Sequence, residues 1–143
     1  MDKVYLGIKF HADYRNRDKI EGISRALEAG GYRCLCVVRD LENWGETRFE
    51  AGELMQKTFA MIDACAAVVI DLSEKGVGLG IEAGYAHARG IPVVVVAEAG
   101  ADISDTLRGI AARVISYGEP SELDSFLPNP LPADFTPNTE DPT

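Results

Sequence analysis

The sequence predicts an α/β protein built on a flavodoxin-like, doubly wound sheet of five parallel strands in the order 2-1-3-4-5. Short β-branched apolar runs alternate along the chain with segments of helical periodicity, which is typical of βαβ units. The runs at 66–71 and 91–96 are apolar almost throughout, as in strands that helices cover on both faces. A length of 143 residues suits one domain with a sizeable core.

The elements of the first half follow from these patterns in order. Residues 4–8 form the first strand, and a polar loop leads to a helix in which Ile20, Ile23 and Leu27 share one face. Two glycines end this helix, and residues 33–38 form the second strand. A further helix is predicted from apolar residues at positions i, i+4 and i+7, namely Met55, Phe59 and Ile62.

The second half of the chain continues the alternation. In order, we expect a strand at 66–71, a glycine-rich loop, a helix that ends at Gly90, a strand at 91–96, a helix at 105–111, a strand at 113–117 and a helical turn at 121–126. Residues 1–127 thus form a single domain. Residues 128–143 carry five of the seven prolines, and we expect this tail to be extended or disordered, or to lie on a neighbouring subunit.

Composition and charge argue against several classes of partner. The formal net charge of −9 disfavours a nucleic-acid polymer or a membrane surface, because both are bound by basic surfaces. The longest apolar run, 91–97, is too short to span a bilayer. Three cysteines without metal-ligand spacing are typical of a reduced, cytoplasmic protein, and Cys34 and Cys36 share one face of their strand. A small anionic ligand in a locally basic pocket is compatible with this charge.

Two loops of the predicted sheet bring unusual residues to one place. Doubly wound sheets bind ligands outside the carboxyl ends of the strands, where the strand order reverses between the first and third strands. The loop after the first strand contains the basic residues Lys9, His11, Arg15 and Arg17. The segment after the third strand contains Gly76, Gly78, Gly80 and Glu82. We therefore expect a small-molecule site between these two segments.

The glycine-rich segment has three interpretations. In the first, it is a structural turn, and Glu82 is favoured by the positive end of a helix. In the second, GLGIEA is a dinucleotide fingerprint with Glu98 twenty positions after Gly78, although the glycines follow the third strand and not the first. In the third, Glu82 is an exposed nucleophile in the first helical turn, kept ionised by the helix N-terminus, and the bare glycine backbone lets a sugar ring lie against it.

The run VGLGIEAGYAHARGIPVVVV, residues 77–96, resembles the nucleoside 2-deoxyribosyltransferase family and its relatives that hydrolyse 2′-deoxynucleoside 5′-monophosphates. Those proteins have a V-G-x-G-x-E-x-G-x-A run whose Glu attacks the anomeric carbon. The likeness extends from the first strand to the region of Arg113 and includes SDTLRGIA. It implies that Glu82 is the nucleophile, that Tyr5 lines the pocket and that Ser104 reaches across a homodimer interface. The alternative for Ser104 is a helix cap.

The chain departs from the family pattern at its carboxylates. The family places an Asp or a phosphate-binding Ser where this chain has Gly76, and it places Asp where this chain has Thr58 and Ala66. Three other carboxylates are close enough in sequence to take over: Asp63, Asp71 and Glu74. We take Asp71, at the end of a buried strand, as the second catalytic residue, and capping of the loop backbone is the alternative.

The resemblance implies an enzyme that cleaves or transfers at the N-glycosidic bond of (deoxy)nucleosides or nucleoside 5′-monophosphates. Glu82 attacks C1′ and forms a glycosyl ester, which water or a second base then resolves. Lys9, Arg15 and Arg17 are the residues expected to bind a 5′-phosphate, and His11 is a further candidate for substrate binding in the same loop. This chemistry requires no metal or other cofactor. The alternative is a non-catalytic module that binds and senses nucleotides.

Overall fold

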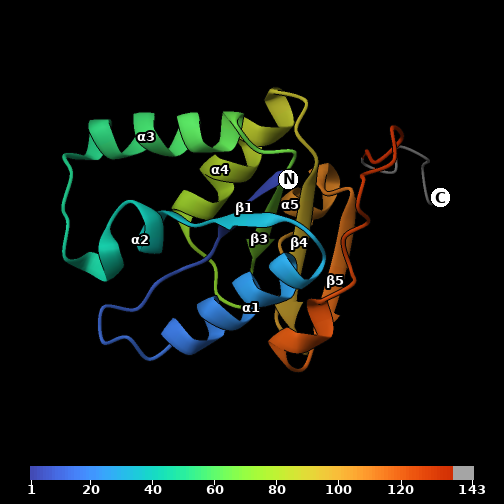
Figure 1. The fold of residues 1–143 in the computed structure, drawn as a ribbon, viewed down its shortest axis with the longest axis horizontal. Coiled ribbons are helices and arrows are strands. Elements are labelled where there is room, and N and C mark those ends of the chain that lie inside the picture. The colour runs from blue at the N-terminus through green and yellow to red at the C-terminus, as the bar shows by residue number, and fades with distance from the viewer. Residues whose placement is uncertain (137–143) are drawn as a thin grey trace.

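The structure, a computed structural model, describes residues 1–136, and its strands form one five-stranded parallel sheet (Figure 1). The strand order is β2-β1-β3-β4-β5, so the predicted doubly wound fold is confirmed. The strands are β1 (Lys3–Gly7), β2 (Arg33–Leu35), β3 (Ala67–Asp71), β4 (Val93–Glu98) and β5 (Arg113–Tyr117). Because every pairing is parallel, the carboxyl ends of all five strands meet at one edge of the sheet.

Helices cover both faces of the sheet. One face carries α1 (Arg17–Ala29) and the 3-10 turn η2 (Pro120–Leu123), and the other carries α3 (Ala51–Asp63), α4 (Val77–Ala88) and α5 (Asp105–Ile110). We call them the α1 face and the α4 face. Val4 and Leu6 of β1 point to the α1 face, whereas Tyr5 points to the α4 face. Within residues 1–136, no helix is long and apolar enough to cross a membrane.

The second strand is shorter than predicted. β2 ends at Leu35, and α2 (Val37–Asp40) replaces the last part of the expected strand at 33–38. The Cys36 amide donates a hydrogen bond to Asp40 Oδ2 at 2.8 Å, so this amide has a local partner in place of a neighbouring strand. A contact with a side chain four residues later therefore ends the strand, and the apolar pattern of the segment does not reveal it.

The glycine-rich segment is mostly helical, which differs from the predicted loop. α4 begins at Val77, so Gly78 and Gly80 lie in its first turn, and Gly76 precedes it with extended backbone. None of these three described glycines has a positive φ. A Cβ at Gly78 or Gly80 would meet no atom within 4 Å outside the helix backbone. Packing within this chain therefore does not require glycine at positions 78 and 80. The side of α4 that carries these two glycines has no side chains packed on it at its start.

Residues 128–136, the described part of the predicted tail, pack on the α1 face. The Tyr32 hydroxyl donates to the Pro128 carbonyl, and Asn129 Nδ2 donates to the Gly30 carbonyl at 3.1 Å. Phe135 is buried in the core of this face. This part of the tail thus contributes a side chain to the core, and residues 137–143 lie outside the described residues.

We predict that Phe135→Ala lowers the free energy of unfolding by about 3 kcal/mol, because truncating a buried phenyl ring loses apolar burial and leaves a cavity. Phe135 is only 4% exposed. The exposed neighbour Thr136 is the matched control, and Thr136→Ala should change stability by less than about 0.5 kcal/mol. Equal urea midpoints for Phe135→Ala and the unmodified chain would contradict the packing of this segment.

Candidate active site

Glu82 and Tyr5 form a buried pair on the α4 face. Tyr5 is 1% exposed, and its hydroxyl donates a hydrogen bond to Glu82 Oε1 at 2.6 Å. Glu82 is the sixth residue of α4, so it lies in the second turn and is partly buried, where the sequence predicts an exposed residue of the first turn. The two residues reach each other because α4 crosses the face of the sheet to which the odd-numbered Tyr5 of β1 points.

The end of β1 is shaped to admit the Glu82 carboxylate. A Cβ at Gly7 would lie 2.7 Å from Glu82 Oε2, a distance that real Cβ contacts do not reach. Any larger residue at position 7 would therefore require the ends of the Glu82 and Ile70 side chains to move. Glu82 Oε2 is also buried without a hydrogen-bond partner among the described residues. One oxygen of Glu82 is thus held by Tyr5, while the other is dry and unpaired.

Burial controls the charge of this pair. Loss of solvent raises the pKa of Glu82 to about 7, although the hydrogen bond from Tyr5 acts in the opposite direction. Burial, together with the nearby Glu82 carboxylate, holds the pKa of the Tyr5 phenol far above its usual value, so Tyr5 remains a donor. Glu82 is therefore balanced between its acid and its carboxylate near neutral pH. Burial here outweighs the helix N-terminus that the sequence suggested would keep Glu82 ionised.

Asp71, the second predicted catalytic residue, lies on the α1 face. The side chains of successive strand residues alternate, so Ile70 packs beside Gly7 and Glu82 while Asp71 points away from them. Asp71 Oδ2 accepts from the Tyr117 hydroxyl at 2.5 Å, and Oδ1 accepts from the Ser73 amide at 2.8 Å. Lys19 Nζ lies 3.8 Å from Oδ1. These contacts join the carboxyl ends of β3 and β5 to α1, and a catalytic role for Asp71 stays a prediction.

The basic residues after β1 separate into two groups. His11 contacts Glu74 of the loop after β3, and the Arg15 guanidinium donates to His11 Nδ1 at 2.9 Å. Arg17 instead lies over the Trp44 ring, with 4.4 Å between the guanidinium carbon and the ring centroid. The predicted residue His11 thus faces the second loop of the crevice. Arg17 faces Trp44, which was not expected because Trp44 is far away in sequence.

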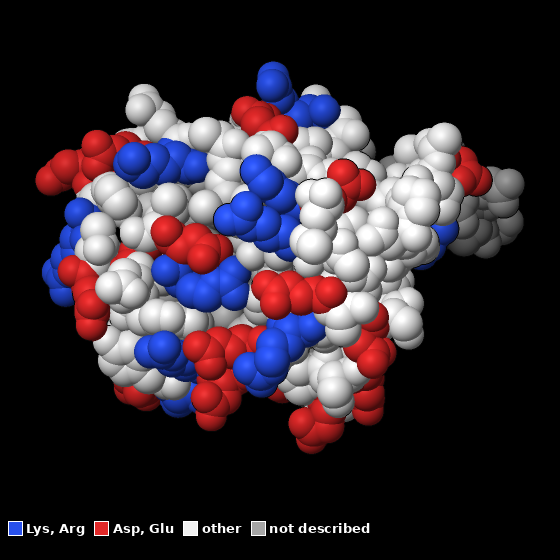
Figure 2. Space-filling model, viewed as in Figure 1, with Lys and Arg blue, Asp and Glu red and all other residues white. Residues whose placement is uncertain are grey.

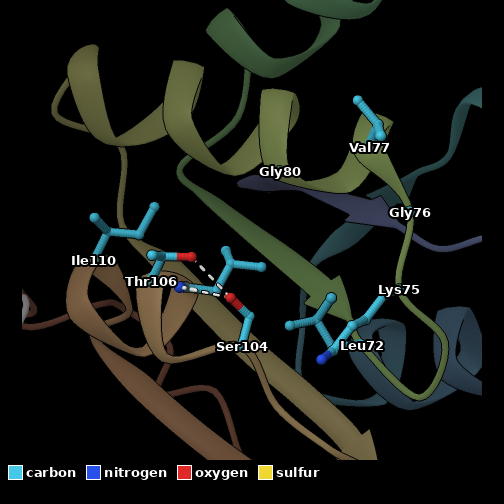
Figure 3. Close-up of a pocket in the computed structure, with 9 residues that line it drawn as sticks. Leu72, Lys75, Gly76, Val77, Gly80, Ser104, Thr106 and Ile110 are labelled. Atoms are coloured by element: carbon cyan, nitrogen blue, oxygen red, sulfur yellow. Dashed lines mark hydrogen bonds between the residues drawn. The ribbon is translucent and has the colours of Figure 1, made fainter.

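A pocket of about 530 Å³ lies between α4 and α5 (Figure 3). Its lining consists of Leu72, Lys75, Gly76, Val77, Gly80, Ser104, Thr106, Leu107 and Ile110. Ser104 lines this pocket and also caps α5 of its own chain, where its hydroxyl accepts from the Leu107 amide at 3.5 Å. The pocket thus brings together three predicted substrate-binding residues: Gly76, Gly80 and Ser104. Gly78 does not line it.

One position beside Glu82, Gly7, escaped the sequence reasoning. Gly7 ends an otherwise β-branched and apolar strand, and this was the available signal, since glycine weakens a strand unless something approaches closely. Thr58, at a position where the resemblance calls for Asp, is buried, and its hydroxyl donates to the Leu54 carbonyl within α3 at 2.8 Å. In residues 1–136, no three His, Cys, Asp or Glu side chains gather to hold a metal ion.

Comparisons of the sequence with known proteins find similarity over most of the chain. The model of a family described as nucleoside 2-deoxyribosyltransferase matches residues 4–124. A putative 2′-deoxynucleoside 5′-phosphate N-hydrolase 1 from Thermofilum pendens is 29% identical over 140 residues, which cover 88% of this chain and 95% of that protein.

Solved structures show the same fold at low identity. A CMP N-glycosidase from Clostridium botulinum has a TM-score of 0.65 and 17% identity, covering 87% of this chain and 96% of its own. A 2-deoxyribosyltransferase from Bacillus psychrosaccharolyticus has a TM-score of 0.62 and 16% identity. The match covers 85% of this chain and 90% of that one. A 2-desoxiribosyltransferase from Leishmania mexicana has a TM-score of 0.54 and 19% identity. The match covers 75% of this chain and 77% of that one.

We predict that Glu82→Gln stabilises the protein at pH 8 and not at pH 4.5. The unfolded chain releases this proton near pH 4.5, but the folded chain releases it near pH 7, so wild-type stability falls as pH rises between these values. A shift of this size corresponds to about 3 kcal/mol at pH 8, which the uncharged amide does not lose.

Urea unfolding of both proteins at the two pH values measures this difference. Glu28→Gln, on the exposed side of α1, is the control and should leave stability within about 0.5 kcal/mol of wild type at both pH values. A Glu82→Gln effect that is the same at pH 4.5 and pH 8 would show that Glu82 does not carry the raised pKa.

Proposed function

Because the chain belongs to the nucleoside 2-deoxyribosyltransferase family, we propose that it cleaves or transfers at the N-glycosidic bond of (deoxy)nucleosides or nucleoside 5′-monophosphates, with Glu82 as the nucleophile. The observation that carries this proposal is the buried, unpaired Oε2 of Glu82. A buried carboxylate oxygen without a hydrogen-bond partner is unfavourable in a folded protein, so its presence favours a chemical role. Tyr5 orients the carboxylate by holding Oε1.

The proposed reaction has two steps. The ionised Glu82 attacks C1′ through an oxocarbenium-like transition state, the bond to the base breaks, and a glycosyl ester forms. Water then attacks the same carbon in a hydrolysis, or a second base attacks it in a transfer, and the Glu82 carboxylate is restored. In its buried surroundings the Glu82 carboxylate is poorly solvated, so it is more reactive toward the sugar than an exposed carboxylate.

In our proposal, Asp71 is a positioning residue that holds the backbone around the site in place. Its carboxylate is satisfied by Tyr117, Ser73 and Lys19, and it points to the face opposite Glu82. Such a group holds the strand ends in register and keeps the loop that leads to α4 in place. Among residues 1–136, Tyr5 is the one hydrogen-bond partner of Glu82, and it already donates its proton to Oε1. We therefore assign the proton of the departing base to another group of the site.

We predict that Glu82→Gln and Glu82→Ala each reduce base release by about 1,000-fold or more, since neither side chain can form the glycosyl ester. For the unmodified enzyme, kcat/KM should rise with pH and level off above about 7, because only the carboxylate attacks and burial raises its pKa to about 7. Chromatography of free base from a panel of nucleosides and 5′-monophosphates measures both effects.

The same panel separates the enzyme from a nucleotide sensor. Tight binding of a nucleotide without any base release would favour the non-catalytic module. Appreciable turnover by the Gln variant would remove Glu82 from the role of nucleophile while leaving the family membership intact.

We further propose a cytoplasmic homodimer in which each subunit helps to close the other's site. Two large apolar side chains of α4 are unusually exposed, Val77 at 84% and Ile81 at 46%. Val77 also lines the pocket that contains Ser104, and Figure 3 shows its side chain at the outer rim. A second subunit on this surface would cover the bare start of α4 and exclude water from the glycosyl ester. The three free, buried cysteines support a reducing compartment.

We predict that Ile81→Glu converts the dimer to a monomer and lowers base release by at least about tenfold, because a charge opposes burial of this surface. Light scattering measures the mass, and the base-release assay measures activity. Arg25→Glu on α1 is the control for the added negative charge and should leave both unchanged. A fully active Ile81→Glu monomer would show that each subunit has a complete site.

A further inference from the structure

The loop between β1 and α1 is folded into a fixed shape by Asn16. Its side-chain amide donates to the Lys9 carbonyl at 2.6 Å, and its Oδ1 accepts from the His11 amide at 3.0 Å. The Tyr14 amide also donates to the His11 carbonyl at 2.8 Å. Because these bonds span residues 9–16, the loop presents the side chains of Lys9, His11 and Arg15 in a defined arrangement before any ligand arrives.

The basic side chains lie close to one carboxylate, that of Glu74: His11 contacts it, Arg15 contacts His11, and Lys9 lines a small cavity together with Glu74. His11 Nε2 contacts Glu74 Oε2, and Arg15 donates to the other ring nitrogen of His11. The same Arg15 nitrogen lies 2.9 Å from His11 Nδ1 and 3.3 Å from Nε2, so the guanidinium is close to both ring nitrogens. The hydrogen bond from His11, followed by the charges of His11, Lys9 and Arg15, lowers the pKa of Glu74. Glu74 is thus a carboxylate held in an anion site.

This anion site lies at the predicted crevice, and Glu74 keeps it closed. Gly7 of β1 pairs with Ile70 of β3, so the loops after these strands leave the sheet side by side. The cavity between them, which Lys9 and Glu74 both line, has a volume of about 10 Å³. That is the space of one water molecule at most. In Figure 2, basic and acidic side chains alternate over the face that carries α1, and no uniformly basic field is visible there.

We propose that Glu74 is an internal stand-in for the 5′-phosphate of the substrate: its carboxylate occupies the anion site of Lys9, His11 and Arg15, and a nucleoside monophosphate must displace it. The inference rests on the proposed function and names a residue that sets the preference between phosphorylated and unphosphorylated substrates. Glu74 is 47% exposed at its side chain, and exposed ion pairs are weak, so a ligand can displace it. A phosphate with nearly two negative charges gains more from the same three groups than a carboxylate does.

The displacement affects only one of the two substrate classes. A monophosphate competes with Glu74, so its apparent affinity is reduced by the fraction of enzyme in which Glu74 occupies the site. A nucleoside presents only a 5′-hydroxyl, and Glu74 can remain bound to His11 while the nucleoside binds. Glu74 therefore narrows the advantage that the basic loop would otherwise give to monophosphates.

Equilibrium binding in the inactive Glu82→Gln background tests this role without turnover. We expect Glu74→Gln to strengthen the binding of 2′-deoxynucleoside 5′-monophosphates by about threefold to tenfold at low salt, with nucleosides unchanged. Lys9→Gln should weaken the monophosphates alone. Asp102→Asn is the matched control, since Asp102 pairs with Lys75 at 2.8 Å in another loop and the variant makes the same change of charge. It should leave the preference unchanged.

Inorganic phosphate gives a readout that is independent of the reaction. The chain has two histidines, so the ring resonances of His11 report phosphate at the site while those of His87 in α4 serve as the reference. Phosphate should shift the His11 signals at lower concentration in Glu74→Gln than in wild type. An unchanged or weaker response to phosphate, or the same gain in Asp102→Asn, would overturn the proposal. If phosphate competition is found but no base is ever released, the stand-in role holds and the proposed function fails.

Discussion

The contact between Tyr5 and Glu82 over Gly7 is the constraint on which the site depends. It requires a phenol that points to the α4 face, a glycine at the end of β1 and a helix that brings a carboxylate down on to the strand. Each requirement concerns a different element, so the contact exists only when the sheet and α4 are packed together. Burial in this packing raises the pKa of the Glu82 carboxylate to about 7, and Oε2 has no hydrogen-bond partner among residues 1–136. The fold thereby holds an ionisable group in an unfavourable environment, which is typical of functional sites.

The two faces of the sheet place Glu82 and Asp71 in different environments. On the α4 face, the core closes around Glu82 and leaves it little solvent. On the α1 face, Asp71 is satisfied by hydrogen bonds from Tyr117 and Ser73, and these bonds tie the carboxyl ends of β3 and β5 together. One carboxylate is therefore dry and incompletely paired, whereas the other is buried and fully paired. The two carboxylates are close in sequence but differ in environment, because they point to opposite faces of the sheet.

The loops at the carboxyl edge of the sheet carry the positive charge that an anion site requires. With a net charge of −9, the chain as a whole repels anions, so any anion site must be local. The loop after β1 meets this need with Lys9, His11 and Arg15, held by the Asn16 side chain. Arg17 is not part of this group because its guanidinium lies on Trp44. A basic residue in the same loop can thus bind a ligand or pack on an aromatic ring, depending on a partner from elsewhere in the chain.

The sequence by itself determined the strand order, the single parallel sheet, the family and the candidate Glu82, because periodicity and a spaced motif are local patterns. Only the tertiary structure decided that Glu82 is buried against Tyr5, that Asp71 points to the other face and that Phe135 joins the core. The end of β2 at Leu35 was likewise decided by the side chain of Asp40. The physical reason is the same in each case. The solvent exposure and the hydrogen-bond partners of a residue depend on segments that are distant in sequence or on side chains that fold back on to the backbone, and a local sequence pattern carries no information about either.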